Sequence, residues 1–199
     1  MIHAWPLVLE ELPESALPPA TSGERARAAK LRDAEQAAVY LRSRRALRAI
    51  LRRHTSARLT FAVTEKGKPY LPGDRELRFN LSRSGGMTLI AMARGIEVGA
   101  DIERIRPLND YAEIAERYFP ASEAAGLREV PMDQREREFF RRWTRIEAVL
   151  KARGVGLYGL GVEIDDNWTI AEIPVWPEYA AAVAAPGRGL PIQVHRFEE

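Results

Sequence analysis

Asp101 and Glu103, in the segment GADIERI, are the first pair of side chains that could do chemistry. On a β-strand, residues i and i+2 project from one face about 6.5 to 7 Å apart, so both carboxylates can converge on one hard cation. The apolar neighbours Ile102 and Ile105 indicate a packed strand. The alternative, favoured for a short motif taken alone, is a solvated edge strand whose acids face water.

Glu147 and Lys151 form a second set, together with Trp143. A spacing of four places them side by side on one helix face, and Glu before Lys is the favourable order for an ion pair. An ordinary surface pair is the simpler interpretation. The segment KARGVGLYGLG follows directly, however, and its closely spaced glycines indicate a close approach of the backbone to a ligand or to another strand.

Hydrogen-bond donors gather in two turn-like segments, KGKPYLP and FNLSRSGG. The donors are Lys66, Lys68, Ser82, Arg83 and Ser84. The pair Gly85-Gly86 leaves backbone amides accessible, so these segments could hold an anion. Neither segment is a P-loop or a dinucleotide-binding fingerprint, and two ordinary polar turns remain the alternative.

The composition limits the chemistry that these residues can share. The chain has 199 residues, no cysteine, three histidines and a net charge of +2. Without cysteine there is no disulfide framework, zinc ribbon or thiolate nucleophile, and the histidines are expected to be too scattered for a metal site. Residues 1–97 carry a balance of +7 and residues 98–199 a balance of −5. Any metal site must therefore use carboxylates, and the basic half is the natural place for phosphates.

The hydrophobic pattern predicts how the elements position these residues. We expect strands over 2–9, 59–63, 77–81, 87–93 and 97–105, helices from about 24, over 33–54, 111–119 and 132–153, and further strands over 162–197. This order predicts an α+β fold with two similar halves that meet near 98–107. No apolar run reaches the ~20 residues of a membrane-spanning helix, and no signal peptide is visible, so we expect a cytoplasmic protein that does not bind membranes.

Four of these segments together resemble a known family. GKP at 67–69, FNLSRSG at 79–85, GADIE at 99–103 and WTRIEAVLKARGVGL at 143–157 occur in the order of the surfactin-synthetase-activating type of 4'-phosphopantetheinyl transferase. That family's pattern reads GKP, FN-x-S-H-S-G, G-x-D-[IV]-E and W-[ST]-x-K-E-A-x-x-K-x-x-G-x-G. The resemblance implies a pseudo-dimer of two α+β subdomains, each a small antiparallel sheet packed on helices. We place them at 1–97, which would bind coenzyme A phosphates, and at 98–199, which would hold magnesium and the catalytic helix.

The resemblance also implies an activity and a role for each matching residue. The family moves the phosphopantetheine arm of coenzyme A onto a serine of an apo acyl or peptidyl carrier protein, with Mg²⁺, and releases adenosine 3',5'-bisphosphate. By position, Asp101, Glu103 and Glu147 would be the metal ligands. Glu147 would also be the base, and Lys151 would bind the pyrophosphate and stabilise the leaving group. The remaining phosphate contacts would come from Lys68, Ser82 and Arg83, and from the arginine-rich helix through Arg44 or Arg48, with Arg42 as a further candidate.

The sequence departs from the family pattern at three positions. Arg83 replaces a histidine, Ile146 replaces a lysine, and Val39 stands where an arginine is usual. One alternative is therefore a divergent, non-catalytic paralogue. Two further alternatives are a nucleic-acid-binding module built on the arginine-rich helix and a metal-dependent phosphoesterase. Against the first, the basic segment holds one aromatic residue, Tyr40, and no recognised binding motif accompanies it. Against the second, the sequence shows neither a histidine cluster nor a second carboxylate group. We expect no nucleic-acid partner, and a monomer suffices because both halves lie in one chain.

Overall fold

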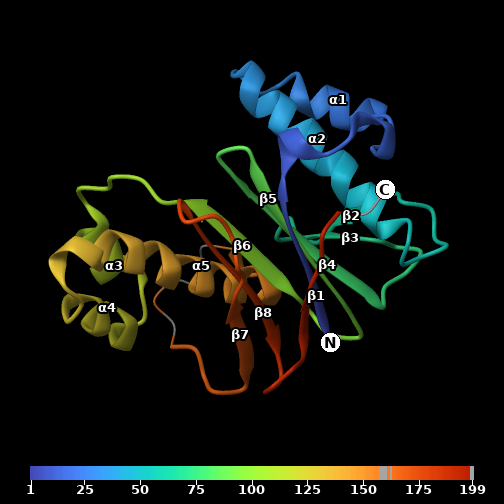
Figure 1. The fold of residues 1–199 in the computed structure, drawn as a ribbon. Helices are drawn as coiled ribbons and strands as arrows, with labels where there is room; N and C mark the ends of the chain where they lie inside the picture. Colours follow the sequence, from blue (N-terminus) through green and yellow to red (C-terminus); the bar gives the residue numbers. More distant parts are fainter. Residues whose placement is uncertain (157–160, 162, 198–199) are drawn as a thin grey trace.

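The computed structural model describes residues 1–156, 161 and 163–197. In this part, the chain folds into a four-stranded and a three-stranded sheet flanked by helices, with a small two-stranded sheet beside them (Figure 1). Outside the described residues lie positions 157–160, which belong to the glycine-rich segment, and position 162, where a strand was expected to begin. The helices are α1 (Ser22–Ala28), α2 (Ala34–Leu51), α3 (Tyr111–Tyr118), α4 (Ala121–Arg128) and α5 (Arg135–Arg153), with short 3-10 turns at Leu9–Glu11, Glu14–Ala16 and Met132–Gln134. The strands are β1 (Ile2–Val8), β2 (Ala62–Val63), β3 (Pro69–Tyr70), β4 (Leu77–Ser84), β5 (Met87–Arg94), β6 (Gly99–Arg104), β7 (Trp168–Glu172), β8 (Tyr179–Pro186) and β9 (Ile192–Val194).

The two halves repeat one topology. In the first, β1 is followed by α2 and then by the antiparallel hairpin β4–β5, whose second strand pairs with β1. In the second, β6 is followed by α5 and then by the hairpin β7–β8, whose second strand pairs with β6. The predicted α+β fold of two similar halves is confirmed. β9 returns to the first sheet, where it pairs in parallel with β1.

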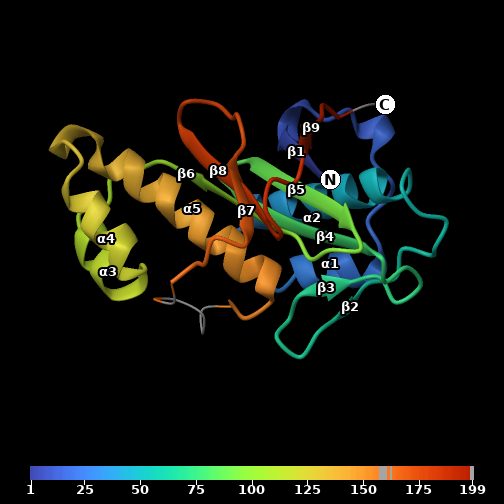
Figure 2. The same cartoon turned by 90° about the horizontal axis from the view of Figure 1, so that it is seen from below.

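The halves stack as four layers: α2, the first sheet, the second sheet and α5. Apolar side chains on the facing sides of the two sheets, including Leu89 and Ile102, form the central core. The outer faces of the sheets are covered by α2, through Leu47, and by α5, through Val149. The views in Figures 1 and 2 place α1 and α2 on one side of the molecule and α3 to α5 on the other.

Local signals in the sequence fix the ends of the helices. Thr21 and Glu24 form a capping box at the start of α1, and Asp33 caps the backbone N–H of Glu35 at the start of α2. Gly154 ends α5 in the left-handed conformation, with φ of 67°, as a C-terminal glycine does. These boundaries agree with the helices predicted from the sequence.

A close contact between β6 and α5 sets the distance between the two acidic segments. A Cβ at Gly99 would lie 1.9 Å from the backbone oxygen of Ala148, so only glycine lets the helix approach the strand this closely. Asp101 and Glu103 follow Gly99 on the same face of β6. Their side chains therefore point at the helix that carries Glu147 and Lys151.

Two local predictions were wrong. The strand expected over 59–63 is reduced to the two residues of β2. In the antiparallel register with β3, residues 59–61 would face residues 71–73, where Pro72 has no backbone N–H to extend the ladder. The turn expected over 82–86 begins only at Gly85, since β4 continues to Ser84. The serines of this segment extend the strand because the backbone of β4 pairs with β5 as far as Ser84 and Met87, and their hydroxyls also find partners on β6, as described below.

The three histidines gather, contrary to our expectation that they are scattered. The Nδ1 atom of His3 lies 2.9 Å from Nε2 of His195, and the ring of His54 lies 6.2 Å from that of His3. All three surround Trp5, on which His195 stacks at 4.6 Å. Burial, followed by repulsion from His195, lowers the pKa of both His3 and His54. This cluster attaches the segment after β9 to β1.

None of the helices in the described part of the chain is both long enough and apolar enough to cross a membrane.

Candidate active site

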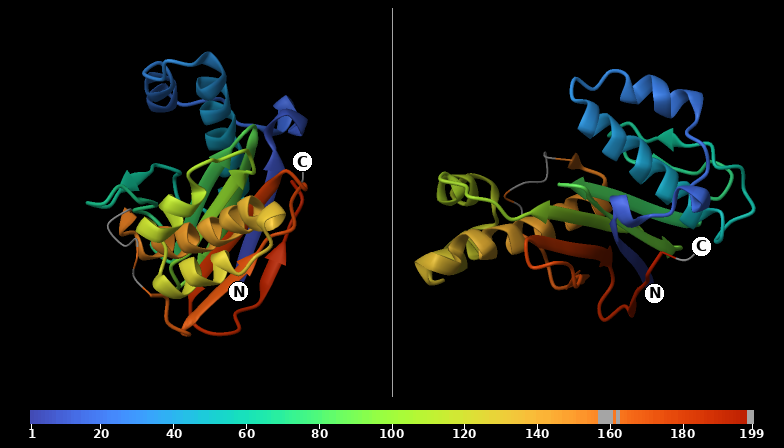
Figure 3. Two further views of the ribbon diagram at one scale, coloured as in Figure 1. Left: turned by 90° about the vertical axis from the view of Figure 1, so that its left-hand side faces the viewer. Right: turned by 45° about the horizontal axis from the view of Figure 1, so that its top comes forward.

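Strands β4 and β6 lie side by side where the two halves meet, in the views of Figures 1 and 3. The hydroxyl of Ser82 donates to Oδ1 of Asp101 at 2.7 Å, and that of Ser84 donates to Oε2 of Glu103 at 2.9 Å. Asn80 accepts a hydrogen bond from the backbone N–H of Ala100 at 3.0 Å. Alternate side chains of the first half thus hold the acidic strand of the second half.

Lys151 joins this cluster from α5. Its Nζ lies 2.5 Å from Oδ1 of Asp101 and 3.1 Å from Oγ of Ser82. Asp101 is 2% exposed, whereas the side chain of Lys151 is 30% exposed. The ion pair is therefore buried at its carboxylate end and open to solvent at its ammonium end, where the lysine can exchange partners.

Three carboxylates share this small region. Burial raises the pKa of Glu103, and the charge of Asp101 adds to the effect. Burial also raises the pKa of Glu147, with further contributions from Asp101 and Glu103, while Lys151 opposes the rise. One buried oxygen on each of Asp101 and Glu147, Oδ2 and Oε1 respectively, has no hydrogen-bond partner. Such oxygens are costly unless another group satisfies them, and a cation would do so.

Within the described residues, no three acidic or histidine side chains are arranged as a formed metal site. The unpaired oxygens of Asp101 and Glu147 nevertheless have the chemistry that Mg²⁺ prefers, since Mg²⁺ binds through one or two carboxylates together with phosphate oxygens and water. The donor set therefore fits a magnesium ion that a phosphorylated substrate helps to hold.

A second basic group lies where α2 passes the end of β4. The guanidinium of Arg83 lies 5.2 Å from the centre of the Tyr40 ring, and that of Arg44 lies 4.5 Å from the Phe61 ring. Burial lowers the pKa of both arginines, and the charge of Arg44 contributes to lowering the pKa of Arg83. The Nε atom of Arg44 is buried and makes no hydrogen bond. This atom lies 3.9 Å from Oε1 of Glu24, in a long ion pair, so Arg44 and Arg83 remain candidates to bind a phosphate.

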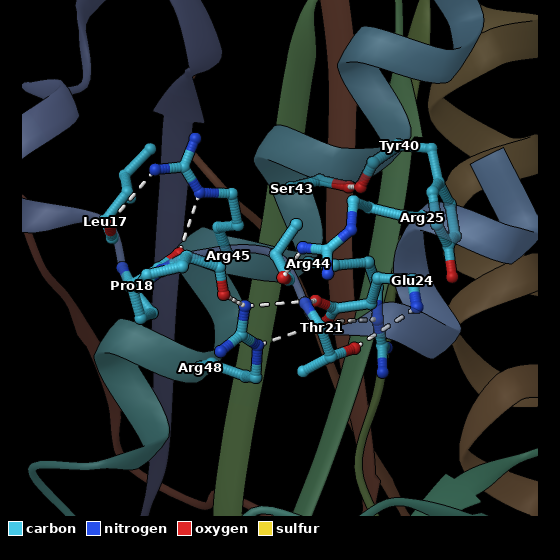
Figure 4. A network of polar contacts seen from close by, with 12 residues as sticks. Leu17, Pro18, Thr21, Glu24, Arg25, Tyr40, Ser43, Arg44, Arg45 and Arg48 are labelled. Carbon is cyan, nitrogen blue, oxygen red and sulfur yellow. Dashed lines mark hydrogen bonds and ion pairs between the residues drawn. The ribbon is translucent and has the colours of Figure 1, made fainter. Parts of the chain in front are cut away.

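The other arginines of α2 are bound to protein groups. Arg48 makes two hydrogen bonds to the buried carboxylate of Glu24, at 3.1 and 3.0 Å, and one to the backbone oxygen of Pro19 (Figure 4). Arg45 donates to the backbone oxygens of Leu17 and Pro18 (Figure 4). Arg42 donates to backbone oxygens at 9 and 12 and to Glu14. These side chains hold the loop before α1 onto α2.

Lys68 lies apart from the carboxylates, under the loop that leads into β6. Its Nζ donates to Glu97 Oε2 at 2.6 Å and to the backbone oxygens of Val98 and Ala152 at 3.2 and 2.9 Å. These bonds use all three ammonium hydrogens. Lys68 thereby ties the entrance of β6 to the end of α5.

Comparison with known proteins agrees with this geometry. Residues 97–197 match the model of the 4'-phosphopantetheinyl transferase superfamily. The 4'-phosphopantetheinyl transferase HetI of Nostoc sp. is 32% identical to this chain, over 94% of the chain and 89% of HetI. The chain belongs to the 4'-phosphopantetheinyl transferase superfamily. The transferase AcpT of Escherichia coli is 38% identical over 52% of this chain and 53% of AcpT, and that of Bacillus subtilis is 35% identical over 51% and 44%.

Membership of the 4'-phosphopantetheinyl transferase superfamily confirms the family resemblance and the enzyme class predicted from the sequence. The structure brings five of the predicted site residues to the junction of the halves. These are Ser82, Asp101, Glu103, Glu147 and Lys151. Arg44 and Arg83 form the separate basic group described above, while Arg48 and Lys68 are bound elsewhere.

The sequence did not lead us to Asn80, and it led us to Ser84 only as a hydrogen-bond donor to a bound anion. The signal was present, since Asn80, Ser82 and Ser84 are polar residues at every second position of a strand and therefore share one face. A polar stripe on an otherwise buried strand indicates that the stripe faces another polar surface of the protein.

Proposed function

We propose that this chain transfers the 4'-phosphopantetheine arm of coenzyme A to a serine of an apo acyl or peptidyl carrier protein and releases adenosine 3',5'-bisphosphate. The observation that carries the proposal is the buried Lys151–Asp101–Ser82 contact, with unpaired carboxylate oxygens beside it, at the junction of the halves. A lysine next to carboxylates that keep unpaired oxygens suits a substrate that brings both phosphate and metal.

The magnesium ligands in this proposal are Asp101, Glu103 and Glu147. When bound, the metal would neutralise the pyrophosphate and so ease departure of the leaving group. The protein residues keep the phosphates and the incoming serine in line, since transfer of this kind depends chiefly on positioning and charge neutralisation.

Glu147 is the proposed base, acting directly or through a water molecule. Its raised pKa makes it a better proton acceptor than an exposed glutamate, provided that it is ionised at the working pH. The serine oxygen forms a bond to phosphorus, the bond from phosphorus to the bridging pyrophosphate oxygen breaks, and the serine proton passes to Glu147. Lys151, on a flexible stem and partly exposed, would neutralise the charge on the leaving group.

For the nucleotide phosphates, Arg44 and Arg83 are the favoured contact for the 3'-phosphate, because the Nε atom of Arg44 makes no hydrogen bond and only a long ion pair, at 3.9 Å, to Glu24. Ser82 would contribute its hydroxyl from the carboxylate side of β4. Arg48 and Lys68, which the family pattern also implicates, would each have to release a protein partner in order to bind a phosphate. We keep residues 1–97 as the proposed phosphate-binding part and 98–199 as the proposed metal-binding part.

Two departures from the family pattern have a structural counterpart. Ile146 is 3% exposed and packs in the core beneath α5, so an apolar residue is accommodated at this position. Val39 packs against the core of the first half. Neither removes a group from the carboxylate cluster, which favours the active enzyme over the divergent paralogue. The nucleic-acid alternative is weakened because Arg42, Arg45 and Arg48 bind the protein's own loop.

We further propose that the enzyme acts as a monomer in the cytoplasm, where coenzyme A and carrier proteins meet, because one chain supplies both sides of the cluster. The test is incubation with coenzyme A, Mg²⁺ and a panel of apo fatty-acid, polyketide and peptide carrier proteins. Intact-mass spectrometry should show the phosphopantetheine mass added to at least one carrier. An unchanged mass for every carrier, with a known transferase modifying the same samples, would overturn the proposal.

A further inference from the structure

The contact between β4 and β6 is made by side chains. The two strands belong to different sheets, and in the described part of the chain no backbone ladder joins them. Instead, Asn80, Ser82 and Ser84 reach across to β6, with acceptors and donors at Ala100, Asp101, Glu103 and Arg104. The position of the acidic strand is therefore set by three polar side chains of the other half.

Ser84 occupies a distinctive place in this contact. Its Oγ accepts a hydrogen bond from the backbone N–H of Arg104 at 3.0 Å and donates one to Oε2 of Glu103 at 2.9 Å. Because the backbone amide occupies a lone pair of the hydroxyl, the proton is directed at the carboxylate. A hydroxyl held in this way fixes both the strand and the orientation of the glutamate.

Glu103 has a competing partner. The Nη1 atom of Arg106 lies 3.9 Å from the same Oε2 atom, and the side chains of Arg106 and Glu103 are 56% and 28% exposed. Without the hydrogen bond from Ser84, the glutamate would be free to turn toward this exposed guanidinium. Such a turn would change the orientation of the carboxylate that the proposed function requires.

We propose that Ser84 is a positioning residue that holds the Glu103 carboxylate in its metal-binding orientation against the pull of Arg106. This inference rests on the proposed function, because it assumes that Glu103 is a metal ligand. Residues that orient metal ligands typically change metal affinity or activity by about 10- to 100-fold when they are mutated. Ser84, in the first half of the chain, is thus part of a site whose metal ligands lie in the second half.

The test compares wild type with Ser84→Ala, Ser84→Thr and Ser84→Cys, and uses Ser56→Ala, at an exposed serine, as the matched control. Binding of Mn²⁺ to the protein without coenzyme A is followed by the electron paramagnetic resonance signal of the free ion. Carrier-protein modification is followed in parallel as a function of Mg²⁺ and of coenzyme A.

For Ser84→Ala we expect the Kd for Mn²⁺ and the Mg²⁺ concentration at half-maximal activity to rise about 10-fold. The KM for coenzyme A should stay within about twofold, and saturating Mg²⁺ should restore most of kcat. Ser84→Thr keeps the hydroxyl and should resemble wild type, whereas Ser84→Cys, a weaker donor, should be intermediate. Adding Arg106→Gln to Ser84→Ala should recover part of the lost affinity, because the competing partner is then gone.

Wild-type Mn²⁺ affinity in a folded Ser84→Ala variant would overturn the inference, and so would a loss of kcat that Mg²⁺ cannot restore. If Ser84→Ala does not fold, the comparison uses Ser84→Thr and Ser84→Cys, and Ser84→Thr should bind Mn²⁺ more tightly. Equal Kd values of these two variants for Mn²⁺ would overturn the inference. The experiment also distinguishes this inference from the proposed function. If the proposed function is wrong, wild type modifies no carrier protein. If only this inference is wrong, wild type still modifies the carrier protein.

Discussion

The Lys151–Asp101 pair offers the sharpest test of how the charges at the site are balanced. Lys151→Ala would leave the 2%-exposed carboxylate of Asp101 without its cation, beside Glu103 and Glu147. Removing one partner of a buried ion pair costs about 3 to 5 kcal/mol, and the 30% exposure of Lys151 points to the lower end, about 3 kcal/mol. For a chain of this length that corresponds to a fall in Tm of about 6 to 12 °C.

The assay is thermal unfolding at pH 8, 7, 6 and 5, with Lys30→Ala as the control at an exposed lysine. The gap in Tm between Lys151→Ala and wild type should narrow as the pH falls. Burial raises the pKa of Glu103 and of Glu147, and Lys151 opposes the rise, so in the variant these two glutamates take up protons more readily and relieve the repulsion among the carboxylates. Mg²⁺ should raise the Tm of the variant more than that of wild type, since it would replace the missing positive charge. The double variant Asp101→Asn/Lys151→Met should recover most of the lost stability.

A Tm within 2 °C of wild type at neutral pH would refute this reasoning, because the buried carboxylate would then not depend on Lys151. A gap that widens toward acid pH would also contradict it.

Two further predictions concern other parts of the molecule. If Arg83 only binds phosphate, Arg83→His should remain active but lose activity more steeply than wild type above neutral pH, as the histidine loses its charge; equal pH profiles for the two enzymes would contradict this role. The pKa values of His3 and His54 are lowered in the folded chain, so stability should decrease as the pH falls below about 6.5, where the unfolded chain takes up protons that the folded cluster resists. The fall in Tm between pH 7.5 and 5.5 should be smaller for His3→Gln, and an equal fall would count against the cluster.

The sequence predicted the parts of the site that are local. Asp101 and Glu103 alternate on a strand, and Glu147 and Lys151 lie one turn apart on a helix, so their faces follow from the period of each element. Glycine, proline and capping residues also placed most helix ends correctly. These features depend on neighbours within a few residues along the chain.

What the sequence did not predict depends on contacts between distant segments. The three histidines are at positions 3, 54 and 195. The return of β9 to β1 brings His195 to His3, and the end of α2 brings His54 to the same place. The arginines of α2 looked like a phosphate-binding surface until the loop before α1 supplied their acceptors. The serines of β4 looked like a turn because their partners on β6 lie 19 or 20 residues away.

The proposed function assigns transfer from coenzyme A to the carboxylates, lysine and serine at the junction of β4, β6 and α5. The most direct measurement incubates wild type and Glu147→Gln with coenzyme A, Mg²⁺ and an apo carrier protein that wild type modifies. Modified carrier and adenosine 3',5'-bisphosphate are quantified together. Wild type should form the two in equal amounts, and folded Glu147→Gln should form neither. Transfer by Glu147→Gln at the wild-type rate, or wild-type release of the nucleotide without carrier modification, would contradict the claim.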